Sequence, residues 1–328
     1  KKKLMEENTE QRIDLTLFSE KIQELKDRIA SVIVGQEQTV DLVLTAILAN
    51  GHVLIEGVPG VAKTLLARLT ARLIDADFSR VQFTPDLMPS DVLGTTVFNM
   101  KTNGFDFHQG PIFADIVLVD EINRAPAKTQ AALFEVMEER QISIDGTTHR
   151  MGDLYTILAT QNPVEQEGTY KLPEAQLDRF LMKITMDYPS LEEEVNILER
   201  HHTNAALVKL DDITPAITKE ELLSLRAFMN QVFVDRTLLQ YIALIVQQTR
   251  TSKAVYLGAS PRASVAMLQS SKAYALLQGR DFVTPEDIKF VAPYVLQHRL
   301  ILTAEAEMEG YSPVKVTQRL IDKVEVPK

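Results

Sequence analysis

The sequence predicts an α/β fold followed by an all-α part, and three observations lead to this prediction. Short apolar runs that read as strands alternate with helical patterns up to about residue 188. A loop with two glycines joins one such strand to a leucine-rich helical pattern at residues 52–69. Beyond Tyr188 only helical patterns remain. Strands that alternate with helices indicate a parallel sheet covered by helices, so we expect an α/β domain at residues 1–188 and a smaller helical domain at residues 189–328.

Four segments of the first part read as strands. Two of them, DIVLVD at 115–120 and YTILAT at 155–160, are apolar almost throughout, which is typical of central parallel strands that are buried on both faces. The other two are HVLIE at 52–56 and SRVQF at 79–83. Between the strands, apolar residues recur with helical spacing, at Val40, Val43, Leu44, Ile47 and Leu48 and again at Leu65, Leu66, Leu69 and Leu73.

Helix signals dominate the second part. Ser190 and Glu193 form a capping box, which predicts a helix that begins after Ser190. Thr284 is followed by Pro285 and Asp287, a cap with proline at the first helical position and an acid in the first turn. Helical patterns cover residues of about 218–232, 236–250, 261–278 and 285–297.

The composition limits the class of protein. Of the 328 residues, 45% are hydrophobic and 24% charged, as is usual in soluble globular proteins. No apolar run approaches the roughly 18 residues of a membrane span, and the first residues show no signal-peptide pattern, so we expect a cytoplasmic protein. The absence of cysteine excludes disulfides, thiolate metal sites and cysteine nucleophiles. The net charge of −10 argues against nucleic acid as a general partner.

The segment GVPGVAKT at residues 57–64 differs at one position from the phosphate-binding loop G-x-x-x-x-G-K-[ST]. Ala62 stands where that pattern has its second glycine. We expect alanine to be tolerated because a residue that enters a helix does not by itself require a positive φ. A strand pattern precedes the loop and a helical pattern follows it, which is the context that the motif requires. The alternative is an ordinary strand–helix turn with a surface lysine.

If the segment is a phosphate-binding loop, its backbone N–H groups surround the β-phosphate of a nucleotide. Lys63 would reach the β- and γ-phosphates, and the hydroxyl of Thr64 would bind Mg²⁺. We therefore predict that ATP contacts Gly57, Val58, Pro59, Gly60, Val61, Ala62, Lys63, Thr64 and Leu65.

Two adjacent carboxylates, Asp120 and Glu121, follow the apolar run at 115–120. Ligands of open α/β sheets bind at the carboxyl ends of the strands, and two neighbouring carboxylates repel each other unless a cation lies close by. Mg²⁺ bound to a nucleotide supplies that charge. Asp120 would hold the metal, and Glu121 would orient and polarise the attacking water. The alternative is an exposed acidic turn.

Five blocks taken together resemble the AAA+ ATPases, and among them the MoxR family. They are GVPGVAKT, GPIFADIVLVDEINRAPAKTQAALFEVMEE at 110–139, ATQNP at 159–163, LPEAQLDRF at 172–180 and GASPRA at 258–263. The family is similar to this chain in having alanine before the lysine and threonine of the loop. The resemblance implies a P-loop core with a five-stranded parallel sheet flanked by helices, and a smaller all-α lid, with ATP bound where the two meet.

The resemblance also implies roles for residues outside the loop. Val34, Gly35 and Gln36 match the segment that lies against adenine. Asn162 matches the sensor that bonds the γ-phosphate or the attacking water; an Asn-Pro turn is the alternative. Arg179 matches the arginine finger, which acts from a neighbouring subunit, and a salt bridge to Asp178 or Glu174 is the alternative.

Arg262 matches the sensor of the lid. It follows Ser260 and Pro261 at a predicted helix start, where a cation opposes the helix dipole unless a phosphate is near. A surface arginine is the alternative, and the sequence does not decide between action on its own subunit's nucleotide and on a neighbour's.

Two segments are similar to insertions of the family. Residues of about 84–109 interrupt the expected helix after the strand at 79–83, and residues of about 141–151 alternate around Asp145-Gly146, which predicts a hairpin. In related AAA+ proteins such insertions face the pore or the substrate; surface loops are the alternative.

The resemblance implies an ATP-driven motor in a homo-oligomeric, hexameric ring. Its role would be chaperone-like: the remodelling or maturation of a client protein or metal insertion, with a von Willebrand A-type partner. Three alternatives stay open: the motor subunit of a metal chelatase, a DNA helicase or loader, which the acidic charge disfavours, and a nucleotide-gated scaffold without catalysis.

Overall fold

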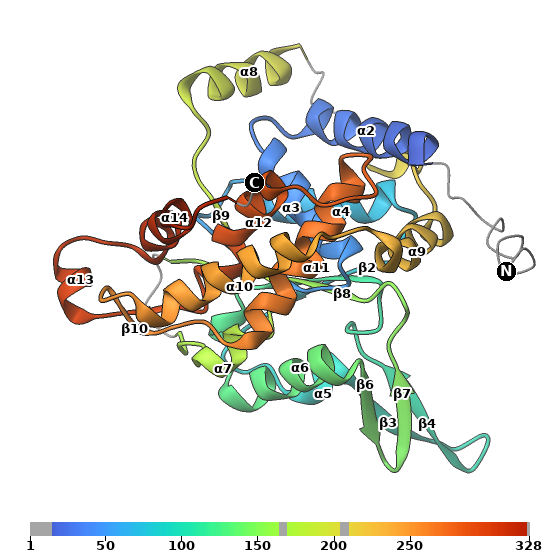
Figure 1. Ribbon diagram of the computed structural model, residues 1–328. Coiled ribbons are helices and arrows are strands. Elements are labelled where there is room, and N and C mark those ends of the chain that lie inside the picture. Colours follow the sequence, from blue (N-terminus) through green and yellow to red (C-terminus); the bar gives the residue numbers. More distant parts are fainter. Residues whose placement is uncertain (1–14, 164–168, 204–209, 327–328) are drawn as a thin grey trace, which may run out of the picture.

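The computed structural model describes residues 15–163, 169–203 and 210–326 (Figure 1). Its strands are β1 (Val53–Gly57), β2 (Phe78–Gln82), β3 (Gly94–Asn99), β4 (Gly104–Gln109), β5 (Ile116–Asp120), β6 (Gln141–Ile144), β7 (Thr147–Arg150), β8 (Thr156–Gln161), β9 (Met182–Met186), β10 (Val255–Leu257) and β11 (Ile301–Leu302). Its α-helices are α2 (Leu15–Val32), α3 (Glu37–Leu48), α4 (Lys63–Leu73), α5 (Pro89–Leu93), α6 (Ala127–Glu139), α7 (Glu174–Leu177), α8 (Leu191–His202), α9 (Lys219–Phe228), α10 (Arg236–Thr251), α11 (Pro261–Leu277), α12 (Pro285–Leu296), α13 (Ala304–Met308) and α14 (Pro313–Lys323). Among these residues, no helix combines the length and the apolar character of a membrane span.

Five parallel strands form the central sheet in the order β2-β5-β8-β1-β9. All five residues of β5 are buried, because this strand lies inside the sheet and is covered on both faces. The predicted α/β fold with a five-stranded parallel sheet is thus confirmed. The order also places β2 directly beside β5, with Gln82 opposite Asp120.

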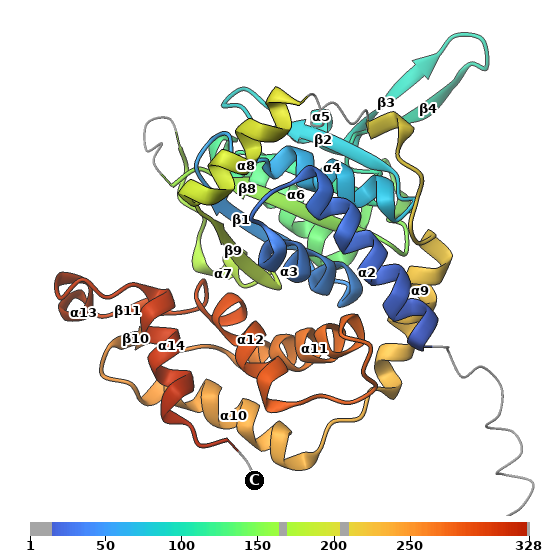
Figure 2. The same ribbon diagram turned by 90° about the horizontal axis from the view of Figure 1, so that it is seen from above.

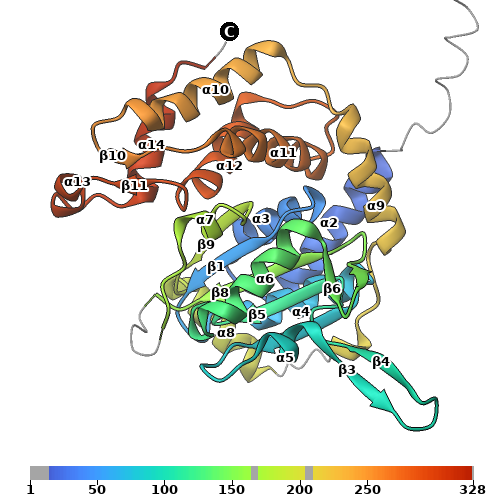
Figure 3. The same cartoon turned by 90° about the horizontal axis from the view of Figure 1, so that it is seen from below.

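Alternate residues of the strands pack into two separate cores. Val53 and Ile55 of β1 join α2, α3 and α4 on one face of the sheet, whereas Leu54 joins α5 and α6 on the other. Figure 3 shows α6 in front of the sheet and α2 and α4 behind it. This alternation is the period-two pattern of a strand that is covered on both sides.

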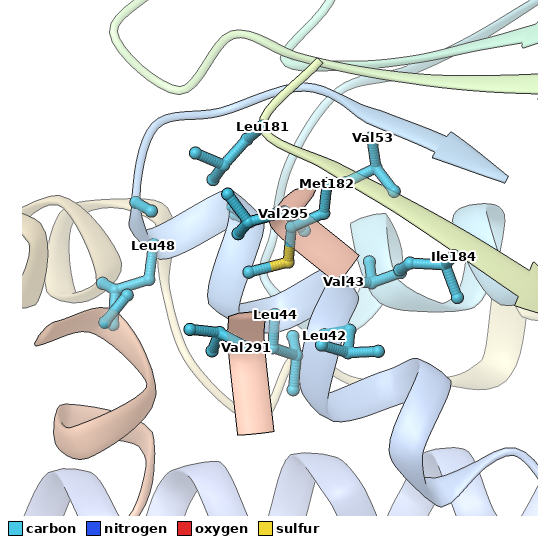
Figure 4. Packing of buried hydrophobic residues seen from close by; sticks show 14 of the residues in the cluster. Leu42, Val43, Leu44, Leu48, Val53, Leu181, Met182, Ile184, Val291 and Val295 are labelled. Atoms are coloured by element: carbon cyan, nitrogen blue, oxygen red, sulfur yellow. The ribbon is translucent and has the colours of Figure 1, made fainter. Parts of the chain in front are cut away.

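Helices α10, α11, α12 and α14 form a group beside the α/β part, which we call the helical layer (Figures 2 and 3). The layer packs on the α/β part through α11, which lies against α3 and α2, and through α12, where Val291 and Val295 lie against β9 and α3 (Figure 4). Before it reaches this layer, the chain runs back along the α/β part, where Lys219 pairs with Asp115 at 2.5 Å. The division of the chain at residue 188 stays a prediction.

Both insertions form hairpins. Strands β3 and β4 pair around residues 100–103, and β6 and β7 pair around Asp145 and Gly146, which have φ of 49° and 78°. The predicted hairpin at 141–151 is therefore confirmed. The two hairpins lie side by side, because the ring of Phe107 is 4.2 Å from that of His149 (Figure 1).

Candidate functional site

The loop between β1 and α4 leaves the sheet at the carboxyl end of β1. Gly57 ends the strand where space is short: a Cβ atom there would lie 2.7 Å from the carbonyl oxygen of Met186. Gly60 has a φ of +90°, a conformation that residues with a side chain rarely adopt. Gly57 is therefore required because the backbone of Met186 lies so close, and Gly60 is required because the turn has a positive φ.

Ala62 has a left-handed conformation, with φ of 64° and ψ of 22°, and precedes the first residue of α4. The expectation that this position needs no positive φ is wrong. The chain has to turn from the loop into the helix within one residue, and the left-handed conformation achieves this turn. It also aims successive N–H groups to the same side, which makes an anion-binding concavity. The position therefore has the requirement that a glycine meets most easily.

Lys63 folds its side chain back over the loop. Its Nζ donates to the carbonyl oxygen of Gly57 at 2.5 Å and of Val58 at 3.2 Å. Partial burial lowers the pKa of the Lys63 ammonium, and the negative charges of Asp120 and Glu121 oppose this shift. The ammonium thus lies among oxygen atoms, in the surroundings that phosphate oxygens would also provide.

Asp120 ends β5 and is buried between two partners. Its Oδ2 accepts a hydrogen bond from Nε of Arg80 at 2.6 Å, and its Oδ1 accepts one from Oγ1 of Thr160 at 3.1 Å. Both partners come from the neighbouring strands, β2 and β8. The sequence did not single out Arg80 or Thr160, because a motif within one strand does not show which strands lie beside it.

Glu121 follows directly and has a φ of 56°, which separates its side chain from that of Asp120. Its Oε2 accepts a hydrogen bond from Nε2 of Gln82 at 2.8 Å and lies 3.1 Å from Nε of Arg124. Its backbone N–H donates to Oγ1 of Thr160 at 3.0 Å. Thr160 therefore contacts both acidic residues, and Gln82 holds the carboxylate of Glu121.

One cavity of about 400 Å³ collects most of the predicted residues. Its lining consists of Pro59, Gly60, Ala62, Lys63, Thr64, Leu65, Arg80, Gln82, Asp120, Glu121, Thr160 and Asn162. Asn162 is buried just beyond the end of β8. Carboxylate and hydroxyl oxygens are the ligands that Mg²⁺ takes in proteins, and Asp120 and Thr64 present both types here. The donor set therefore fits a triphosphate with its metal ion.

The predicted adenine segment lies between α2 and α3, outside that lining. Gly35 has a φ of +73°, and a Cβ atom there would lie 2.3 Å from Oε1 of Glu193. Helix α8 thus covers the segment, and Arg200 of the same helix donates to the carbonyl oxygens of Ala30 and Ser31. Gln36 lines a separate hollow of about 310 Å³ together with residues of α2 and α3.

Arg179 and Arg262 lie together, but at a different cavity from Lys63. Both line a hollow of about 490 Å³ between the sheet and α11. Nη2 of Arg179 lies 2.9 Å from Oε2 of Glu138, and Nη2 of Arg262 lies 3.3 Å from Oε1 of the same carboxylate. The salt bridge considered for Arg179 therefore has another partner, since Asp178 pairs with Arg299. Neither arginine lines the cavity of the chain's own phosphate-binding loop.

Comparison with known proteins agrees with this arrangement. The sequence pattern of the ATPase family associated with various cellular activities (AAA) matches residues 52–182, and that of the AAA lid domain matches residues 247–322. The uncharacterized protein YeaC of Bacillus subtilis is 47% identical over 92% of this chain and 93% of its own length. Chaperone MoxR1 of Mycobacterium tuberculosis is 44% identical over 90% of this chain and 80% of its own.

Two more distant likenesses extend the comparison. Protein MoxR of Methylorubrum extorquens is 31% identical over 85% of this chain and 87% of its own. A solved crystal structure of a protein from Cytophaga hutchinsonii superposes with a TM-score of 0.87 at 40% identity, and covers 96% of this chain and 97% of that one.

Proposed function

Because the chain belongs to the MoxR family of AAA+ ATPases, we propose that it uses ATP hydrolysis to remodel or mature a partner protein, as a chaperone-like motor. The observation that carries this proposal is the common cavity of Lys63, Thr64, Asp120, Glu121 and Asn162. Those side chains come from the loop after β1 and from the ends of β5 and β8. Each supplies a group that phosphoryl transfer to water requires.

We assign the grip on ATP to the loop and to Lys63. The N–H groups around Ala62 and at the start of α4 face the β-phosphate, helped by the dipole of the helix. Lys63 exchanges the carbonyl oxygens of Gly57 and Val58 for oxygens of the β- and γ-phosphates. Thr64 and Asp120 would hold Mg²⁺, which would supply positive charge beside the phosphates. Arg80 competes with the metal ion for Oδ2 of Asp120.

We assign the activation of water to Glu121. Its carboxylate is held by Gln82 and Arg124 in this structure, and from this position it accepts the proton of a water molecule aligned with the γ-phosphate. Asn162, buried at the end of β8, donates its amide N–H to the same water or to the γ-phosphate. Thr160 of β8 would then keep both acidic residues in place through its hydrogen bonds to Asp120 and Glu121.

We propose that Arg179 and Arg262 serve the nucleotide of a neighbouring subunit. The support is their position: they share Glu138 at a second cavity instead of lining the cavity of their own loop. A homo-oligomeric ring, hexameric as in the resemblance, brings the two cavities of adjacent subunits together. An arginine supplied in this way is worth about 10³–10⁵ in rate in other nucleotide hydrolases.

The client would contact the paired hairpins. The β3–β4 hairpin exposes Phe98, Met100 and Phe105, whose exposed fractions are 47%, 88% and 74%. Large exposed apolar side chains that lie close together are typical of surfaces that bind another protein. A von Willebrand A-type partner would join the ring as an adaptor for the client.

Substitution of Glu121 by Gln tests the proposal. The variant keeps Lys63, Thr64 and Asp120, so it should bind ATP with the parental affinity, whereas its turnover should fall by at least about 100-fold. Isothermal calorimetry measures the first quantity and phosphate release the second. A pull-down with this trapped variant should retain the client only when ATP is present. Turnover at the parental rate would show that Glu121 does not activate the water.

A further inference from the structure

Arg299 joins the helical layer to the segment that carries Arg179. It lies three residues beyond the end of α12, and its side chain is 5% exposed. Its Nε donates to Oδ1 of Asp178 at 2.6 Å. Its Nη2 donates to the carbonyl oxygens of Asp178 at 3.2 Å and Phe180 at 2.7 Å. Its Nη1 donates to the carbonyl oxygen of Leu181 at 3.1 Å.

The residues before Arg299 extend this contact. Nε2 of His298, a buried side chain, lies 3.0 Å from the carbonyl oxygen of Phe180. Nε2 of Gln297 donates to the carbonyl oxygen of Lys183 at 2.5 Å. Three consecutive side chains that follow α12 therefore bind the backbone on both sides of Arg179 and at Lys183, the second residue of β9.

Burying a charged guanidinium to hold a backbone segment costs free energy, because the charge loses its contact with water. Removing it from water lowers the pKa of Arg299, and the contact with Asp178 opposes this shift. The cost is offset only when the N–H groups find partners in the right geometry, and all three nitrogen atoms of Arg299 do. Lysine cannot reproduce this arrangement, because its ammonium is a point charge without the planar fork.

The contact with Arg299 bears on catalysis because Arg179 lies between two of the residues that Arg299 binds. Asp178 and Phe180 flank Arg179, so their backbone fixes where the Arg179 side chain starts. The same helical layer carries Arg262 on α11, which packs against α12. Arg262 thus belongs to the helical layer, and the backbone around Arg179 is attached to it through Arg299, while the Arg179 guanidinium itself contacts Glu138 and the carbonyl oxygen of Phe134 on α6.

We propose that Arg299 is a positioning residue for Arg179: it holds the backbone on both sides of the arginine finger in place against the helical layer, and so sets where the finger's side chain starts. The inference rests on the proposed action of Arg179 on a neighbour's nucleotide. A displacement of about 1 Å at a reacting group can cost about 100-fold in rate, and this sets the size of the expected effect.

The first test compares Arg299→Lys with Arg280→Lys. Arg280 likewise binds a carboxylate of the helical part, donating to both oxygens of Asp287 at 2.5 and 2.8 Å, and its other hydrogen bond goes to the carbonyl oxygen of Phe282, away from the finger segment. Arg299→Lys should lower kcat by about 10- to 100-fold and leave ATP affinity and KM within about twofold. Arg280→Lys should leave kcat unchanged even if it lowers the Tm as much. An unchanged kcat in Arg299→Lys overturns the inference.

The second test locates the defect by mixing subunits. Lys63→Ala lacks a working loop but keeps its finger, whereas Arg179→Ala lacks the finger but keeps its loop. Mixed with Lys63→Ala, Arg299→Lys should regain ATPase activity, because its intact loop meets an intact finger. Mixed with Arg179→Ala, it should stay inactive, because neither subunit offers a working finger.

Two mixtures distinguish a failure of the positioning role of Arg299 from a failure of the trans role of Arg179. Lys63→Ala and Arg179→Ala should restore each other; if they do not, the trans role of Arg179 fails and the inference fails with it. If they do, recovery of Arg299→Lys with Arg179→Ala instead of Lys63→Ala overturns the inference alone. Should Arg299→Lys not fold, Asp178→Asn, which removes one anchor charge without changing shape, must show the same complementation pattern.

Discussion

Replacing Ala62 by Gly restores the glycine of the usual phosphate-binding loop and tests the left-handed turn directly. Ala62 has a φ of 64° in this structure. A left-handed conformation costs an L-residue about 1–2 kcal/mol, and glycine adopts it without that cost. Glycine also makes the unfolded chain more flexible, which costs about 0.4–1 kcal/mol. The difference is a net stabilisation of about 0–1.6 kcal/mol, or about 0.8 kcal/mol at the middle of both ranges.

Thermal unfolding of the nucleotide-free protein measures this effect as a rise in Tm of about 1–4 °C. Ala131→Gly is the matched control, because Ala131 is exposed within α6. There glycine should cost about 1 kcal/mol, so the two identical substitutions should have opposite signs. ATP affinity of Ala62→Gly should stay within about threefold of the parent, since the backbone keeps its course. If Ala62→Gly destabilises the protein as much as Ala131→Gly does, the left-handed assignment is wrong.

Three further predictions concern the cavity and the buried histidines. Lys63→Ala should abolish ATP binding in calorimetry, and retention of micromolar affinity would exclude Lys63 as the phosphate ligand. Arg80→Ala frees Asp120 from its ion pair, so half-saturating Mg²⁺ for ATP binding should fall; a higher requirement would mean that Arg80 assists binding. Burial lowers the pKa of His52 to about 3, below its ordinary 6.5. The stability that the neutral, buried imidazole gives to the folded state is therefore fully present above pH 6.5 and is lost as the pH falls toward 3. His52→Asn should therefore reduce the acid-side slope of the unfolding free energy by up to about 1.4 kcal/mol per pH unit, measured by urea denaturation, although buried His298 still contributes in the same direction.

Local patterns were enough to predict the framework of the fold. Ser190 accepts from the backbone N–H of Glu193 and the box closes as expected, and α10, α11 and α12 begin at the predicted residues. These signals work because caps and apolar periodicity act within a few residues of each other. Strand β9 was not located from its own residues, since the short run MKITM follows α7 without a turn signal. The number of strands came from the resemblance instead.

The residues of the site that lie in contiguous motifs could also be predicted from the sequence, whereas those that depend on neighbouring strands could not. Lys63, Thr64, Asp120 and Glu121 belong to contiguous motifs, and the structure brings them to one cavity. Arg80 and Gln82 were missed, because their role depends on β2 being the neighbour of β5 and on the register that sets Gln82 opposite Asp120. The turn at Ala62 was misjudged for a different reason. Its residue type gives no sign of a positive φ, which is imposed by the tight connection between loop and helix.

If Arg179 and Arg262 act on a neighbour's nucleotide, as proposed, the charges of the two cavities should complement each other across the interface between subunits. The cavity of Arg179 and Arg262 is also lined by Arg140 and Arg299, with Asp178 as its one acidic lining residue among those described. Glu138 pairs with Arg179 and Arg262 in this structure, so a neighbour's polyphosphate would have to replace that carboxylate, and the described lining of this cavity has no phosphate-binding loop of its own to bind one. The cavity of Lys63 has the loop, and with ATP and its metal bound it would carry an exposed, negatively charged γ-phosphate toward solvent. Opposite charges attract across an interface and speed encounter. ATP should therefore tighten the contact between neighbours, and hydrolysis with loss of the γ-phosphate should weaken it, which is the alternation that a ring motor needs.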